Sequence, residues 1–201
     1  MKKTMKKILA LGSGAALLVT ASVMGTMAYL SSTTGVVKNT FTFGQVNITL
    51  DEEEVTEYGI DTDKDVVNRV QANTYKLIPG HNYLKDPTIH VAAGSEECYL
   101  FVKVVDGLAN IEAENTIATQ MAANGWSSVS GAENVYAYSS TVDAREAKNE
   151  IDVKVFDNFT LKTDANVADY SNAEITITAY AIQADGFTSS DDAWSKAPAW
   201  N

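Results

Sequence analysis

Two stretches in the C-terminal half of the chain alternate between apolar and polar residues with a period of two. The first runs from Ile151 to Leu161, and the second runs from Ile175 to Ala181. This alternation is typical of antiparallel strands that bury one face and expose the other. The run Cys98–Val105 is instead apolar on both faces, which predicts a strand in the middle of a sheet that is covered on each side.

Shorter patterns extend this β-rich reading along the rest of the chain. The apolar parity changes at Gly44, between Val37–Phe43 and Val46–Leu50, as expected for a bulge or a break between two strands. The acidic stretch Asp51–Glu54 that follows is predicted to be a loop. Further strands are predicted at 66–78, 88–91 and 135–138, with turns at Pro79-Gly80 and Gly94–Glu97.

Two short helices are predicted between and after these strands. The first covers Asn110–Asn124, with apolar residues one turn apart and a stop signal at Asn124-Gly125. Ser190 is predicted to cap the second, which extends through Trp194. The whole pattern predicts an all-β fold with short helical inserts, an antiparallel sandwich of the jelly-roll type. Because the sequence shows neither a repeat nor a low-complexity linker, we expect residues 29–201 to form one domain.

The first thirty residues have the pattern of an export signal. Four lysines among the first seven residues precede the uncharged apolar stretch Ile8–Leu30, which contains small residues close to Ala28. This predicts a signal peptide helix over residues 1–28, cleaved between Ala28 and Tyr29, and a secreted protein. An uncleaved membrane anchor is the alternative, since the stretch is long enough to span. Its glycines, serines and threonines favour cleavage.

Removal of residues 1–28 makes an acidic chain more acidic. Lys plus Arg falls from 15 to 11 while Asp plus Glu stays at 26, so the net charge changes from −11 to −15. Such a chain repels nucleic acid and anionic membrane surfaces, so no nucleic-acid partner is expected. The single cysteine, Cys98, excludes an intramolecular disulfide and is predicted to be a buried, inert thiol.

The sequence contains no recognisable catalytic motif. His81 and His90 are the only histidines, no HExxH helix occurs, and serine-nucleophile and phosphate-loop motifs are missing. A zinc site built from both histidines and a carboxylate stays an alternative. The carboxylates of Asp61, Asp63 and Asp65 alternate as in a calcium loop but lack its glycine, so a solvated acidic loop is favoured over a weak calcium site. We therefore expect neither catalytic residues nor a cofactor.

The order of several loose motifs resembles the TasA/camelysin family of exported Gram-positive proteins. The leader ends in GTMAYLSST, followed by NTFTFGQVNITLDE, YKLIPGHNYLKDPTIHVAAGSEECYLFVKV and ITAYAIQADGF. The resemblance implies processing at Ala28-Tyr29 by a SipW-type signal peptidase, a jelly-roll domain and a place in the extracellular matrix or on the cell surface. It also implies homopolymeric biofilm fibres, with an accessory matrix protein as a further candidate partner.

Members of this family assemble by donor-strand exchange, in which the N-terminal strand of one subunit completes the sandwich of the next. The best candidate donor lies within residues 29–43, where Val37, Phe41 and Phe43 share one parity. Two other functions are kept open. One is a secreted metallopeptidase of the camelysin type, which the missing zinc motif disfavours, and the other is a monomeric cell-surface binding domain.

Overall fold

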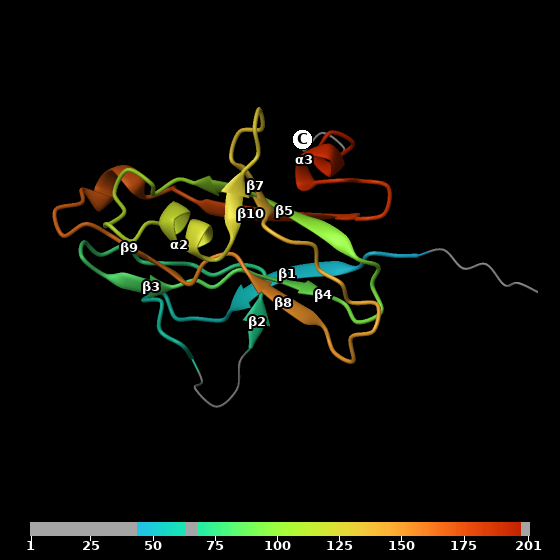
Figure 1. The fold of residues 1–201 in the computed structure, drawn as a ribbon. Helices are drawn as coiled ribbons and strands as arrows, with labels where there is room; N and C mark the ends of the chain where they lie inside the picture. Colours follow the sequence, from blue (N-terminus) through green and yellow to red (C-terminus); the bar gives the residue numbers. More distant parts are fainter. Residues whose placement is uncertain (1–43, 63–67, 198–201) are drawn as a thin grey trace, which may run out of the picture. The chain divides into compact units, whose positions relative to one another are not determined.

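The computed structural model describes residues 44–62 and 68–197, and within them the chain is mostly β with antiparallel sheets and two short helices (Figure 1). The elements in chain order are β1 (Ile48–Glu53), β2 (Arg69–Val70), β3 (Asn82–Leu84), β4 (Thr88–Val91), β5 (Cys98–Asp106), α2 (Ile117–Ala123), β6 (Trp126–Ser128), β7 (Val135–Tyr138), β8 (Ile151–Lys154), β9 (Asn158–Thr160), a 3₁₀ turn (Val167–Tyr170), β10 (Ile175–Gln183) and α3 (Ser190–Trp194). The predicted β-rich class with helical inserts is confirmed.

The strands form two four-stranded sheets and one small pair. The first sheet has the order β2-β1-β4-β8, the second has the order β10-β5-β7-β6, and β3 pairs with β9 (Figure 1). All pairings are antiparallel. The longest joins β10 to β5 over nine residues, from Ile175 opposite Asp106 to Gln183 opposite Cys98. As its two apolar faces predicted, β5 lies inside a sheet.

Both four-stranded sheets contribute side chains to one hydrophobic core. Ile89 of β4 and Val153 of β8 pack in the same cluster as Leu100 and Val102 of β5. The opposite face of β5 is covered as well, because Phe101 packs with residues of β7 and α3 in a second cluster. This explains why Cys98–Val105 does not alternate: both faces of β5 are buried, and each needs apolar side chains.

Two predicted strand boundaries are wrong. The acidic stretch is not a loop, because Asp51 pairs with Thr88 of β4 and Glu52 and Glu53 pair with β2. The strand predicted at 66–78 reduces to Arg69–Val70, while 71–78 has no strand and 63–67 lie outside the described residues. The alternating run that begins at Ile151 also divides, since β8 belongs to the first sheet whereas β9 pairs with β3.

Both helices begin at other residues than predicted. The first begins at Ile117, because Thr116 caps it and the Glu112 carboxylate accepts a hydrogen bond from the Ile117 amide. Residues 110–116 form turns and a bridge instead, and the predicted stop at Asn124-Gly125 is confirmed. Ser189 rather than Ser190 caps α3, and its hydroxyl accepts from the Asp192 amide. No helix in the described ranges is long and apolar enough to cross a bilayer.

Candidate functional site

The free edge of β10 is the feature from which a functional site can be built. Within the described ranges β10 pairs with β5 alone, so it lies at the end of its sheet (Figure 1). The Gly107 amide donates to the Glu174 carbonyl at 2.9 Å, and the Ala184 amide donates to the Glu97 carbonyl at 2.7 Å. These two bonds place the even-numbered residues of β10 in hydrogen-bonded pairs with β5. The N–H and C=O groups of the odd-numbered residues therefore point away from β5.

The side chains of the same odd-numbered residues face the hydrophobic core but stay partly exposed to solvent. Ile175, Ile177, Ala179 and Ala181 are only partly buried and pack against the main core cluster. Val102 and Leu100, which face the same cluster from β5, are fully buried. The core is therefore less well covered along β10 than in the middle of the sheet, as is typical where a neighbouring strand could be added.

A groove with a volume of about 1000 Å³ runs beside the start of β10. One wall is formed by residues 173–177, and the other by the end of β1 and the segment 71–77. Its apolar lining consists of Leu50, Ala72, Tyr75, Leu77, Pro87, Leu108, Val167, Tyr170, Ala173, Ile175 and Ile177. Since this groove brings apolar side chains next to backbone groups that have no partner within the described ranges, it has the features required to bind an extended peptide segment.

Charged side chains on the β1 side of the groove are paired with one another. Arg69 donates from Nε to Asp51 at 2.7 Å and from Nη1 to Asp86 at 2.8 Å. Burial raises the pKa of Asp51, but the hydrogen bonds from Arg69 and His90 outweigh it and lower this pKa overall. Lys85 and Glu52 form a buried ion pair nearby. This side of the groove is therefore polar, and these charged side chains have hydrogen-bond or ion-pair partners within the protein.

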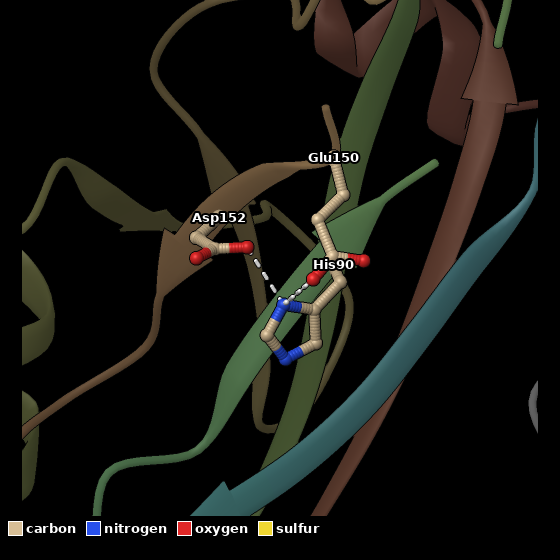
Figure 2. A group of neighbouring side chains, drawn as sticks. All are labelled: His90, Glu150 and Asp152. Carbon is tan, nitrogen blue, oxygen red and sulfur yellow. Dashed lines mark hydrogen bonds and ion pairs between the residues drawn. The ribbon is translucent and has the colours of Figure 1, made fainter. Parts of the chain in front are cut away.

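His90 lies on the outside of the first sheet between the carboxylates of Asp51 and Asp152, and Figure 2 shows its ring beside Asp152 and Glu150. Its Nδ1 lies 2.7 Å from Asp152 of β8, its Nε2 lies 2.8 Å from Asp51 of β1, and Glu150 is 3.6 Å from Nδ1. His90, Glu150 and Asp152 could in principle offer three ligands to a metal ion. However, a ring that hydrogen-bonds to carboxylates through both nitrogens carries both protons, whereas a metal ligand is neutral.

The arrangement around His90 is therefore best described as an imidazolium that joins three strands. Burial lowers the pKa of His90, but the hydrogen bonds to Asp51 and Asp152 outweigh this effect and raise it above the ordinary value. In the register, His90 stands opposite Thr49 of β1 and opposite Asp152 of β8. The charge therefore connects neighbouring strands on the outer face of the first sheet.

The structure does not bring the two histidines into one group. The Nε2 atom of His81 lies 2.9 Å from the Tyr58 carbonyl, and its ring packs on Tyr83. The expected burial of Cys98 is confirmed, because its side chain has no exposed surface and burial raises the pKa of the thiol to about 11. Thiolate chemistry is accordingly disfavoured at this position.

Several predicted site residues lie outside the described ranges. These are the processing pair Ala28 and Tyr29, the donor residues Val37, Phe41 and Phe43, and the calcium candidates Asp63 and Asp65. Asp61 is described: it forms a bridge with Val55, and its carboxylate contributes to a raised pKa at Glu53, for which burial is the larger cause. The calcium hypothesis therefore stays a prediction.

Sequence reasoning missed the polar residues that line the groove. Glu52 has the same strand parity as Ile48 and Leu50, so extending that strand by two residues would have placed its side chain inward. Lys85 and Asn73 gave no such signal, because the segments that hold them have no regular periodicity. No protein-family model, curated protein or solved structure matches this chain.

Proposed function

We propose that this protein is a secreted structural subunit of extracellular matrix fibres and that its copies assemble by strand addition. In this proposal, residues 36–43 of one copy lie beside β10 of the next and complete a jelly-roll sandwich there. The observation that carries the proposal is that, within the described ranges, the edge of β10 is free and lies next to a groove of about 1000 Å³ lined by both polar and apolar side chains. Such an edge offers main-chain hydrogen bonds to a partner strand and pockets for alternate side chains.

The donor segment suits this groove in its pattern of apolar side chains. Val37, Phe41 and Phe43 share one parity, so in a strand their side chains would point to one face. Each phenylalanine ring buried among the groove's apolar residues would contribute roughly 1.5–3 kcal/mol. Because donor and groove are different parts of the same chain, the proposed contact between copies is head to tail and extends into a filament unless it closes on itself.

The predicted leader fits this assignment. A chain cleaved between Ala28 and Tyr29, by a SipW-type signal peptidase as the family resemblance implies, would begin just before the donor segment. Export would then coincide with release of the strand needed for assembly. We propose no catalytic role, and the peptidase alternative has no specific support, because the two histidines have separate hydrogen-bond partners.

Removal of residues 29–43 from the processed protein tests the proposal. The intact chain should form fibres visible by negative-stain electron microscopy, and the truncated chain should stay monomeric in analytical ultracentrifugation. The double variant Phe41→Asp/Phe43→Asp should behave like the truncation, because burial of unpaired carboxylates is costly.

Two results would contradict strand addition by this segment. One is a truncated protein that still forms fibres of normal appearance. The other is an intact processed protein that stays monomeric at all salt, pH and protein concentrations tried. In the second case the monomeric surface-domain alternative would be favoured.

A further inference from the structure

Lys85, Glu52 and Asn73 form a polar triad beside the groove, in which Lys85 and Glu52 are buried and Asn73 is partly buried. Lys85 and Glu52 expose only 7% and 4% of their surface, and the Lys85 ammonium donates a hydrogen bond to Glu52 Oε2. Asn73 Nδ2 donates to the other oxygen of the same carboxylate, Oε1, at 3.0 Å. One carboxylate therefore holds a primary amine on one side and a carboxamide on the other.

Lys85 lies beside an aromatic ring as well as beside the Glu52 carboxylate. Its Nζ lies 5.9 Å from the centre of the Tyr75 ring, whose hydroxyl donates to the Leu84 carbonyl at 3.0 Å. Glu52, whose Oε2 accepts the hydrogen bond from Nζ, is the group placed to take a proton from it. The product is a free amine, the nucleophilic form of lysine.

The amide of Asn73 is held in a position that activates its carbonyl carbon. Its Oδ1 accepts a hydrogen bond from the Val55 backbone amide at 3.0 Å. A fixed amide donor at this oxygen stabilises the negative charge that develops when a nucleophile adds to the carbon. Its Nδ2 is fixed by Glu52 Oε1 and by the Glu53 carbonyl, at 3.0 and 2.8 Å, so the leaving nitrogen lies next to the group that can protonate it.

We propose that Lys85 and Asn73 join in an autocatalytic intramolecular isopeptide bond, with Glu52 as the general acid and base. The neutral Nζ of Lys85 attacks Cγ of Asn73, and Glu52 takes a proton from the nitrogen and passes it to Nδ2. The Cγ–Nδ2 bond breaks, a Cγ–Nζ amide forms, and one ammonia leaves. The reaction requires no oxidant, metal or cofactor.

The bond would join two irregular segments that line the groove. Asn73 lies in the segment after β2, and Lys85 lies between β3 and β4. Neither segment has strand pairing of its own at these residues, so a covalent link would hold the wall opposite β10 in place. This inference does not depend on the proposed function, because the triad would react whether or not the protein polymerises.

The test is the intact mass of the purified full-length or processed protein. We expect a mass lower than that of its sequence by one ammonia. Trypsin should then release residues 70–76 and 77–103 as one branched species, because modified Lys85 is no longer cleaved. The variants Lys85→Arg, Asn73→Ala and Glu52→Gln should each restore the unreduced mass, while the matched surface variant Lys154→Arg should keep the ammonia loss.

Three outcomes would overturn the proposal. Each is measured on the unsubstituted protein, so none depends on whether a variant folds. The first is an intact mass equal to that of the sequence. The second is loss of water with a link between Lys85 and Glu52, which would make Glu52 the acceptor. The third is an ammonia loss that maps to Asn124-Gly125, where a succinimide can form, together with unlinked peptides 70–76 and 77–85.

Discussion

The free edge of β10 can be blocked without breaking its pairing to β5. In the register, Ala179 stands opposite Val102 at a position whose N–H points away from β5. The variant Ala179→Pro removes this donor and places a pyrrolidine ring where an added strand would bring its carbonyl. Proline is tolerated at edges for the same reason, because no internal ladder bond is lost.

The size of the effect follows from the groups that the proline removes or leaves unpaired. One backbone hydrogen bond contributes about 0.5–1.5 kcal/mol, and an incoming carbonyl buried without a donor costs about 1–3 kcal/mol. The sum of about 1.5–4.5 kcal/mol weakens each subunit contact by about 12-fold to 1,600-fold. The critical concentration for fibre formation should rise by the same factor, whereas the monomer should unfold within a few degrees of the parent.

Sedimentation of a concentration series, with electron microscopy of the pellets, measures this critical concentration. The matched control is Lys154→Pro at the edge of β8. Its N–H also points away from the neighbouring strand, because the Val155 amide bonds to the Pro87 carbonyl and fixes the parity there, and Lys154 does not line the groove. An unchanged critical concentration for a folded Ala179→Pro protein, or an equal rise for Lys154→Pro, would refute assembly at the β10 edge.

Four further predictions follow from the same structure. Protonated His90 should stabilise the fold below its ordinary pKa of 6.5, and this stabilisation should be lost as pH rises through its raised folded-state pKa. In urea denaturation at pH 6, the variant His90→Gln should be about 1 kcal/mol less stable than the parent and should lack this pH dependence. Burial and the Asp106 charge raise the pKa of Glu112 from 4.5 to about 7, so the free energy of unfolding should fall by up to roughly 3 kcal/mol as pH rises from 4.5 to 7. The variant Glu112→Gln should not show this fall and should be more stable than the parent at pH 8. Phe159→Ala should cost about 3–5 kcal/mol in the same assay, because its fully buried ring stacks on Tyr83 with centroids 4.7 Å apart. Edman sequencing of secreted material should begin at Tyr29, and a retained leader would contradict the predicted cleavage.

Local pattern predicted the two longest strands. The alternation at Ile175–Ala181 and the doubly apolar run at Cys98–Val105 both predicted strands that the structure contains as β10 and β5. This prediction works because successive side chains of a strand point to opposite faces, so the polarity of neighbouring residues indicates whether one face or both are buried. The same logic predicted β4 and β7 at their observed residues.

Pairing partners and element ends were decided by contacts between residues far apart in the chain. Asp51–Glu53 extend β1 because β4 and β2 supply hydrogen-bond partners, although their composition is that of a loop. The helix starts at Ile117 because the buried carboxylate of Glu112 accepts its free amide. Propensity is a weak prior, and tertiary partners of this kind override it.

The candidate sites were decided almost entirely by the tertiary structure. The sequence by itself indicated an exported, acidic, β-rich chain with one inert thiol and no catalytic motif. It could not show that β10 ends its sheet, because an edge strand and a paired strand can carry the same alternating pattern. Nor could it show that Glu52, Asn73 and Lys85 meet, since hydrogen bonds between segments remote in sequence exist only once the chain has folded around them.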